Sequence, residues 1–280
     1  DIKIYTDKTN NKYKKKIKIN DDSSKDSIDF LNKSISFLTF VPEMERLFQS
    51  SPTYKRNFID RLIFSGRNEY NTLMNRYKKY LIERINILKS DNYDEHWLKQ
   101  IEKEISITGL EIYKARNSQL KLLNQNLDKL ENSNKFKFIF TLEIKDNFFN
   151  THLDLDKYLS ILYKSRSLDK FNGGTNIGPH RSNINVKINN DYDASLLSTG
   201  QQKTLVLMIL LAQCNFLIND KNITPILLFD EIGSHLDSVN RELLLDMINR
   251  FDIQFFLTGT ERNLFSFVST NAQFYNISKI

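Results

Sequence analysis

The last third of the chain alternates helices with strongly apolar strands, and this pattern limits the possible folds more than any other feature. The stretch PILLFD (residues 225–230) holds four consecutive large apolar residues, and a second apolar stretch, IQFFLT (residues 253–258), follows a predicted helix through Arg241 to Arg250. Another predicted helix, from about Thr199 to Ile218, precedes the first strand. Strands without a polar side are typical of parallel sheets buried on both faces. We therefore expect an α/β lobe whose parallel sheet is covered by helices on both faces.

The rest of the chain divides by its pattern into two segments ahead of this lobe. Residues 1–41 alternate loosely between polar and apolar side chains and predict an incomplete β segment of the same lobe. Residues 42–172 repeat apolar side chains at helical spacing and predict a helical arm, within which Lys135 to Ile144 alternates like a strand. The α/β lobe itself takes residues 173–280.

The composition excludes several classes of protein. The chain of 280 residues is 40% hydrophobic and 26% charged, which is ordinary for a soluble globular protein. Its longest strongly apolar run, Leu205 to Ala212, is shorter than the ~20 residues that cross a bilayer, and no secretory signal is found. The single cysteine, Cys214, excludes an internal disulfide and a cysteine metal cluster. We expect a cytoplasmic protein without membrane contact, whose net charge of +6 permits nucleic-acid binding without demonstrating it.

Asp230 and Glu231 directly follow the first apolar strand. Strands of a parallel sheet deliver ligand-binding residues at their carboxyl ends. In phosphate-transfer ATPases, an aspartate at this place holds Mg²⁺ through water, and a neighbouring glutamate orients or deprotonates the attacking water. Two solvated acids are the simpler interpretation of the pair alone. The stretch SHLD (residues 234–237) favours the ATPase interpretation, because ABC-type ATPases carry a Ser-x-Leu-Asp turn there that crosses the dimer interface.

The stretch LSTGQQK (residues 197–203) opens the long predicted helix and has two interpretations. Ser198 and Gln201 have the spacing of a capping box. A capping box does not call for Gly200, which costs ~1 kcal/mol relative to alanine inside a helix and somewhat less at its end. A glycine is reasonable where another backbone or a phosphate approaches closely, and a helix N-terminus binds anions. The stretch resembles the ABC signature, usually Leu-Ser-Gly-Gly-Gln, with Thr199 in the third position.

A phosphate loop of the pattern G-x-x-x-x-G-K-[ST] is absent from the sequence. Residues 173–178, GGTNIG, supply the two glycines, but Pro179 and His180 follow in place of lysine and serine or threonine. No Gly-Lys dipeptide occurs anywhere in the chain. Because the chain begins at Asp1 and not at methionine, we expect that an amino-terminal piece is missing from this sequence.

Five stretches in a fixed order resemble the RecF family. FVPEMERLFQSSPTYKRNFIDRLI (residues 40–63) resembles that family's Pro-Glu segment, its Ser-Pro step and its Arg-x-Phe-x-Asp pattern. GPHRSNI (residues 178–184) resembles its Gly-Pro-His-Arg segment, and LSTGQQK, LLFDEIGSHLD and FFLTGTE complete the series. The resemblance spans residues 40 to about 265 and implies an ABC-type ATPase head of the SMC kind with an inserted helical arm, whose phosphate loop lies in the missing region.

The resemblance also implies a mechanism and partners. RecF proteins are bacterial recombination mediators in which ATP brings two heads together, each nucleotide lying between one subunit's phosphate loop and the other's signature. The implied homodimer binds duplex DNA near single-stranded gaps, hydrolyses ATP slowly and, with RecO and RecR, helps load RecA. The residues implied to contact ATP or the partner subunit are Ser198, Thr199, Gly200, Gln201, Asp237, Thr258 and Thr260, with Asp230 for Mg²⁺ and Glu231 for the attacking water.

Two sets of residues keep alternative interpretations. His180 and Arg181 either contact a phosphate or the dimer interface, or they belong to a structural turn held by Pro179. DNA contacts could come from basic residues of the stretch KYKKKIK (residues 12–18) and of the arm, although solvated faces look the same in sequence. The candidates are Lys14, Lys15, Lys16, Arg56 and Arg61.

Two alternative functions remain beside the DNA-repair ATPase. One is a different ABC-type head, either of the SMC kind or from a transporter. The roughly 130 residues between Pro42 and Gly178 are too few for a long coiled coil at ~1.5 Å per residue, and the stretch LTGTE lacks the switch histidine of transporters. The other alternative is a binding module without catalytic activity, because half of the nucleotide site is absent from the sequence.

Overall fold

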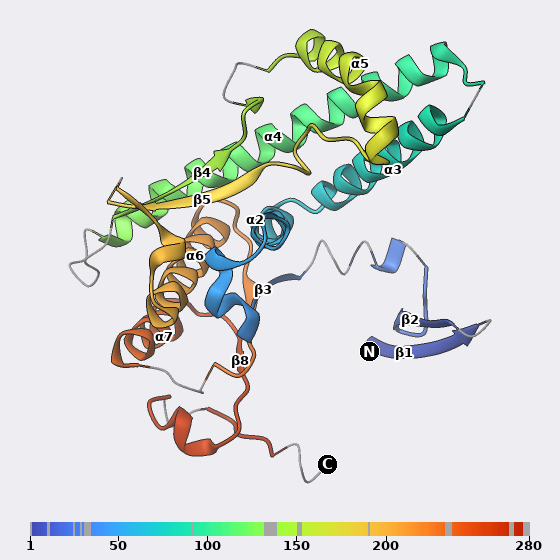
Figure 1. The fold of residues 1–280 in the computed structure, drawn as a ribbon. Helices are drawn as coiled ribbons and strands as arrows, with labels where there is room; N and C mark the ends of the chain where they lie inside the picture. Colours follow the sequence, from blue (N-terminus) through green and yellow to red (C-terminus); the bar gives the residue numbers. More distant parts are fainter. Residues whose placement is uncertain are drawn as a thin grey trace.

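The computed structural model describes residues 2–9, 12–24, 26–28, 30, 35–90, 92–131, 139–149, 153–189, 191–232, 237–268 and 272–276. These residues form a lobe around a parallel sheet, a long helical arm with its own antiparallel sheet, and a two-stranded hairpin (Figure 1).

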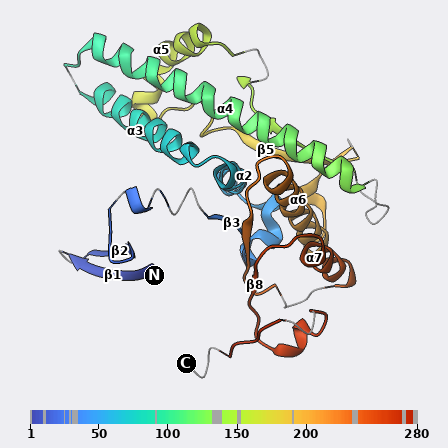
Figure 2. The same ribbon diagram turned by 180° about the vertical axis from the view of Figure 1, so that it is seen from behind.

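A parallel sheet in the order β3-β7-β8 forms the base of the lobe. β7 (Pro225–Phe229) lies in the middle and pairs in parallel with β3 (Ser36–Phe40) and with β8 (Phe255–Leu257). α6 (Thr199–Asn219) and α7 (Ser238–Arg250) pack together on one side of this sheet (Figures 1 and 2). The prediction of a parallel α/β lobe is therefore confirmed.

The second face of this sheet differs from the prediction. Successive residues of a strand point to opposite faces. Leu38 and Leu227 are a register pair and are buried, whereas Phe37 and Phe256 are 48% and 49% exposed. Within the described ranges, helices therefore cover one face of the sheet, and the other face presents partly exposed aromatic side chains.

The arm consists of α2 (Pro52–Gly66), α3 (Glu69–Lys89), α4 (Glu95–Glu131) and α5 (Leu155–Asn172). α4 has 37 residues, which corresponds to about 55 Å, and it runs from the far end of the arm down to the lobe (Figure 1). Ahead of α2 lies a 3-10 segment, η1 (Pro42–Gln49), with Glu43 and Glu45 in its first turn.

An antiparallel sheet lies beside α4, where the alternation of the sequence predicts strands. β4 (Phe140–Lys145) pairs with β5 (Asn183–Ile188), and β5 pairs with the short β6 (Tyr192–Asp193). η3 (Ala194–Leu196) then leads into α6, and η4 (Arg262–Phe265) follows β8. The sheet thus joins the end of the arm to the start of α6.

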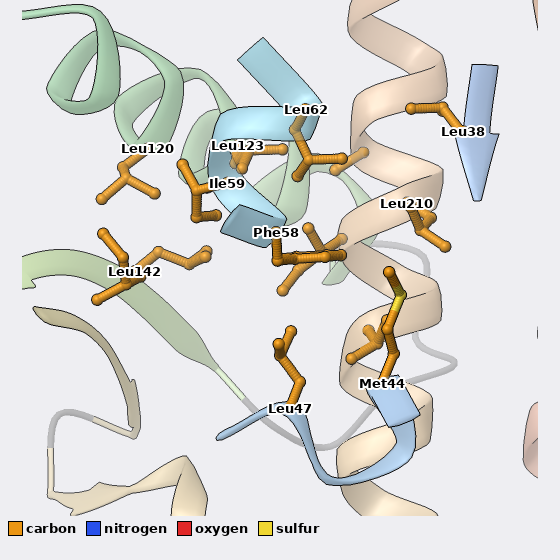
Figure 3. Close-up of a cluster of buried hydrophobic side chains, with 14 of the residues drawn as sticks. Leu38, Met44, Leu47, Phe58, Ile59, Leu62, Leu120, Leu123, Leu142 and Leu210 are labelled. Atoms are coloured by element: carbon orange, nitrogen blue, oxygen red, sulfur yellow. The ribbon is translucent and has the colours of Figure 1, made fainter. Parts of the chain in front are cut away.

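One hydrophobic core joins the arm to the lobe. Figure 3 shows part of it, with side chains from β3, η1, α2, α4, β4 and α6 directed toward one another: Leu38, Met44, Leu47, Phe58, Ile59, Leu62, Leu120, Leu123, Leu142 and Leu210. Buried amides support the same junction. Gln213 of α6 donates through Nε2 to the carbonyl of Leu62 (2.9 Å) and to Oγ of Ser65 (3.0 Å), and it accepts from Nε2 of Gln119 in α4 (2.7 Å). The base of the arm is therefore fastened to α6.

The hairpin at the start of the chain lies apart from the lobe and the arm. β1 (Ile2–Thr9) and β2 (Lys12–Ile19) pair in antiparallel fashion. Both views show the hairpin beyond the uncovered side of the parallel sheet (Figures 1 and 2).

α6 has the length and apolar character of a membrane-spanning helix, which the short apolar run in the sequence did not suggest. An 18-residue window of α6 has a mean hydropathy of 1.3, and 78% of that window is buried inside the structure. A core helix meets the same criteria, and α6 lies at the centre of the packed lobe.

Candidate functional site

The three parallel strands end at one edge of the sheet, and the acidic pair stands there. Asp230 follows β7 and donates its backbone N–H to the carbonyl of Phe40, the last residue of β3 (2.9 Å). Thr258 follows β8 and donates its N–H to the carbonyl of Phe229 (2.9 Å). The side chains of Asp230, Glu231 and Thr258 are exposed, so this carboxyl edge offers two carboxylates and a hydroxyl to a ligand.

The hydroxyl of Thr258 links the two acidic residues. It donates to Oδ1 of Asp230 (2.6 Å) and accepts from the backbone N–H of Glu231 (2.8 Å). Glu231 has a φ of +48°, a left-handed conformation that costs about 1–2 kcal/mol for a residue with a side chain. Thr258 thus holds the strained backbone of Glu231 and orients the carboxylate of Asp230. Thr260 is exposed as well, but its side chain makes no hydrogen bond within the described residues.

Ser198 and Gln201 form the capping box that their spacing predicts. Oγ of Ser198 accepts from the N–H of Gln201 (3.3 Å), and Oε1 of Gln201 accepts from the N–H of Ser198 (3.0 Å). The cap uses one lone pair of the serine hydroxyl and leaves its O–H able to donate. The N–H groups of Thr199 and Gly200 belong to the first turn, where no intrahelical acceptor exists. This helix end therefore carries a hydroxyl donor, two backbone donors and the positive end of the helix dipole.

The start of α7 lies directly beside the start of α6. Asp237 caps α7 by accepting from the N–H of Asn240 (2.8 Å), and a Cβ on Gly200 would lie 3.3 Å from Oδ2 of Asp237. Asn240 is 1% exposed, and its Oδ1 lies 2.9 Å from the hydroxyl of Thr204, which also lies 3.0 Å from the carbonyl of Gly200. The close approach of Asp237 explains why a residue without a side chain stands at position 200. The sequence analysis had singled out Asp237 but not Asn240 or Thr204.

The remaining residues of the motif stretches are Ser234 and Leu236 of the Ser-x-Leu-Asp turn and Lys203 of the signature stretch. Ser234 and Leu236 of the Ser-x-Leu-Asp turn lie outside the described residues. Lys203, the last residue of the signature stretch, is 4% exposed and pairs with Glu45 of η1 (2.6 Å). Lys203 therefore fastens α6 to the segment that follows β3.

The Gly-Pro-His-Arg turn packs against the arm helices. Nδ1 of His180 lies 2.9 Å from the hydroxyl of Tyr77, and Nε2 lies 2.7 Å from the carbonyl of Thr175. Burial lowers the pKa of His180 to about 4, so the neutral ring donates from Nε2 and accepts at Nδ1. A Cβ on Gly178, whose φ is +129°, would overlap the hydroxyls of Tyr158 and Tyr77. These contacts support the structural interpretation of the turn.

The Arg-x-Phe-x-Asp stretch of α2 holds the same turn in place. Arg56 is 9% exposed and donates through Nη1 to the carbonyl of Ser182, which lies 126 residues away in the sequence. Asp60 binds Arg116 of α4 through two hydrogen bonds (2.8 and 2.9 Å), and Arg116 donates through Nη1 to the carbonyl of Pro179. The two family stretches therefore form one structural contact between the arm and the turn.

These contacts correct part of the predicted DNA surface. The guanidinium of Arg56 is buried and bonded inside the protein, so Arg56 is not available to DNA. Arg61 is exposed on α2, and Arg181 is exposed while its Nε donates to the carbonyl of Thr175 (3.3 Å). The sequence analysis missed Arg116. Its sequence signal is a charged residue on the apolar side of a helix, four residues from each of Ile112 and Leu120, which are both buried.

The predicted DNA lysines Lys14, Lys15 and Lys16 belong to β2, and their side chains lie outside the described part of the structure. In both views the hairpin lies apart from α2, the helix that carries Arg61 (Figures 1 and 2).

Known proteins match most of the chain. The family described as the RecF/RecN/SMC N terminal domain matches residues 45–279. The DNA replication and repair protein RecF of Rickettsia prowazekii (strain Madrid E) is 35% identical over 234 residues, which are 82% of this chain and 65% of that protein. RecF of Rhizobium rhizogenes (strain K84 / ATCC BAA-868) is 32% identical over 270 residues, which are 94% of this chain and 72% of that protein. The chain thus spans about two thirds of the length of these relatives.

Solved structures of RecF have the same fold. One, described as the recombination mediator protein RecF-ATP in the RecFOR pathway, matches with a TM-score of 0.74 and 26% identity over 93% of this chain and 72% of that one. A second, described as RecF-ATPrS, matches with a TM-score of 0.73 over 94% of this chain and 72% of that one, also at 26% identity. The predicted ABC-type head with a helical arm is therefore confirmed. From its motifs, its fold and these relatives, the chain belongs to the RecF family of DNA replication and repair proteins.

Proposed function

We propose that this chain contributes the signature side of an ATP-binding homodimer in a DNA replication and repair protein. The observation that carries the proposal is the exposed start of α6, where Ser198 keeps an O–H donor and Thr199 and Gly200 keep their N–H groups while Asp237 lies alongside. A helix N-terminus with free donors binds phosphate groups. In the dimer, this end contacts the nucleotide held by the partner subunit. The ATP named for the matched RecF structure supports this assignment.

The carboxyl edge of the sheet suits a hydrated magnesium ion. Thr258 occupies Oδ1 of Asp230, and the second carboxylate oxygen makes no hydrogen bond within the described residues. Those residues also hold no group of three or more His, Cys, Asp or Glu side chains that could enclose a metal. Mg²⁺ is commonly held by one or two carboxylates together with water and substrate phosphates, and there it neutralises phosphate charge. Asp230 would hold the ion through water, and Glu231 would orient the attacking water.

The basic hairpin is the proposed contact with DNA phosphates. β2 carries five lysines in eight residues: Lys12, Lys14, Lys15, Lys16 and Lys18. Contacts of lysine with phosphate do not depend on base sequence and weaken with salt. We propose that the dimer binds duplex DNA beside single-stranded gaps in the cytoplasm, hydrolyses ATP slowly, and acts with RecR and RecO to help load RecA.

The signature assignment is tested by Ser198→Asp in the full-length gene product. Aspartate caps a helix as well as serine does, so the stability of α6 is retained, but its carboxylate repels a phosphate. We expect the variant to fold normally and to lose ATP-dependent dimerisation in light scattering. The matched control is Ser51→Asp, because Ser51 caps α2 by accepting from the N–H of Tyr54. If Ser198→Asp dimerised at the same ATP concentration as the parent protein, the proposed contact of Ser198 with the partner's nucleotide would be wrong.

The second candidate function, a binding module without hydrolysis, follows from the absent Gly-Lys pair of a phosphate loop. We expect the 280 residues alone to hydrolyse ATP negligibly, and turnover that disappears in Glu231→Gln would contradict this. In the full-length gene product, Glu231→Gln should instead trap an ATP-bound dimer. Binding to gapped duplex should require ATP there, and equal binding without ATP would argue against a clamp.

A further inference from the structure

α5 turns an unusual set of side chains to the outside of the arm. Its buried side holds Tyr158, Leu162, Ser165 and Asp169. Its exposed side, which we name the outer α5 face, combines three apolar residues with three lysines. The members are Tyr163 (59% exposed), Leu168 (57%), Phe171 (88%), Lys157, Lys164 and Lys170. At 100° per residue these six positions fall within one side of the helix, together with a single acid, Asp156.

The attachment of α5 to the arm does not use this face. Asp169 binds Nη1 of the buried Arg84 of α3 (2.7 Å), and Ser165 donates to the same carboxylate (2.6 Å). Arg166 binds Glu102 of α4 through Nε and Nη2 (3.0 and 2.7 Å). Because these buried bonds hold the helix in place, exposed Phe171 and Leu168 have no part in fixing α5.

The ring of Tyr163 stacks on the guanidinium group of Arg166. The guanidinium carbon of Arg166 is 4.7 Å from the centre of that ring. Arg166 is held from the other side by Glu102 and also by both carboxylate oxygens of Glu95 (2.8 and 3.0 Å). At the C-terminal end of the helix, Nζ of Lys89 comes within 3.6 Å of the Cβ position of Gly173, two residues beyond Phe171. A cation therefore lies against the ring of Tyr163, and another lies at the C-terminal end of α5.

We propose that the outer α5 face binds single-stranded DNA. Exposed aromatic rings on which bases stack, set among cations that contact phosphates, are the combination that binds single strands without sequence preference. Tyr163 and Phe171 would receive bases, and Lys164 and Lys170 would contact the backbone. A protein partner fits less well, because the cores of protein interfaces are depleted of lysine. The inference rests on the proposed DNA-repair function, but it concerns a surface separate from the hairpin and the nucleotide site.

The test measures the binding of this chain to fluorescent oligo(dT) of about 16 nucleotides by anisotropy. Loss of one stacking ring should weaken binding about 5- to 100-fold, so we expect this loss in both Phe171→Ala and Tyr163→Ala. Phe171→Leu distinguishes stacking from simple apolar contact, because leucine keeps apolar area but has no ring. It should bind like Phe171→Ala. The matched control is Tyr275→Ala, which removes a ring that is 78% exposed near the C-terminal end of the chain.

Three further measurements distinguish failure of this inference from failure of the proposed function. Lys164→Gln should reduce the slope of log affinity against log salt by about 0.7 on the single strand. Duplex binding is measured on the full-length gene product with ATP, where Phe171→Ala should bind duplex like its parent. Parent-like affinity of Phe171→Ala or Phe171→Leu for oligo(dT) would overturn the inference, and so would failure of the parent chain to bind oligo(dT). Failure of the full-length parent to bind duplex with ATP would instead count against the proposed function.

Discussion

Replacing Gly178 by alanine tests whether the Gly-Pro-His-Arg turn is structural. The new Cβ would overlap the hydroxyls of Tyr158 and Tyr77, both of which are buried, and overpacking of this kind costs about 1–3 kcal/mol. The backbone φ of +129° adds about 1–3 kcal/mol for a residue with a side chain. The lower entropy of the unfolded alanine chain returns about 0.4–1 kcal/mol. We therefore expect a net loss of about 1–6 kcal/mol in the free energy of unfolding.

The measurement is urea denaturation followed by far-ultraviolet circular dichroism, with Gly174→Ala as the matched control. Gly174 lies in the same turn outside the left-handed region, and its added Cβ would meet Nη2 of Arg181 at an ordinary 3.8 Å. The control should be neutral or slightly stabilised. Tyr158→Phe in the Gly178→Ala background should recover part of the loss, because it removes one overlapping hydroxyl. A free energy of unfolding for Gly178→Ala within about 0.5 kcal/mol of the parent value would refute the reasoning.

Three further predictions concern Arg116, His180 and Thr258. Arg116→Met should lower the free energy of unfolding by about 3–5 kcal/mol in urea denaturation, because it leaves the part-buried carboxylate of Asp60 without its arginine. Exposed Arg181→Met should change it by less than about 0.5 kcal/mol. Burial lowers the pKa of His180 to about 4 in the folded protein, against an ordinary value of 6.5, so the unfolded chain binds more protons and stability should fall as pH drops from about 6.5 to 4. A flatter dependence of stability on pH in His180→Gln would check this, and an unchanged dependence would contradict it. Thr258→Val removes the hydrogen bond to Oδ1 of Asp230 and should weaken magnesium-dependent ATP binding of the full-length gene product about 10- to 100-fold in calorimetric titration. Thr258→Ser keeps the hydroxyl and should retain the binding. Equal binding by both variants would exclude a positioning role for Thr258.

Features that depend on a few neighbouring residues could be predicted from the sequence. The capping box of Ser198 and Gln201 involves residues three apart, and β7 follows from consecutive apolar residues that end at an acidic pair. The order of the family stretches was enough to predict the ABC-type head. In each case the physical cause, a cap or a buried strand, is complete within one segment of chain.

Contacts between distant segments could not be predicted in this way. Thr258 reaches Asp230 because β8 pairs with β7, and the sequence contains no rule for that pairing. Arg56 looked like a surface cation, since nothing in α2 shows that the carbonyl of Ser182 lies above it. The uncovered face of the parallel sheet has the same origin, because the apolar strands β3 and β8 do not reveal which helices pack against them.

Because α4 is one continuous helix, a rotation at its lower end moves its far end. Its lower part is clamped to α6 by the bond between Gln119 and Gln213, and the first turns of its far end carry α5 through Arg166 with Glu95 and Glu102. The part of α4 from Gln119 to Glu95 is about 36 Å long, so a tilt of about 5° at the clamp displaces the far end by about 3 Å. Small adjustments of α6, whose first residues form the signature, are therefore magnified into ångström-scale travel at the tip, without any hinge inside the arm.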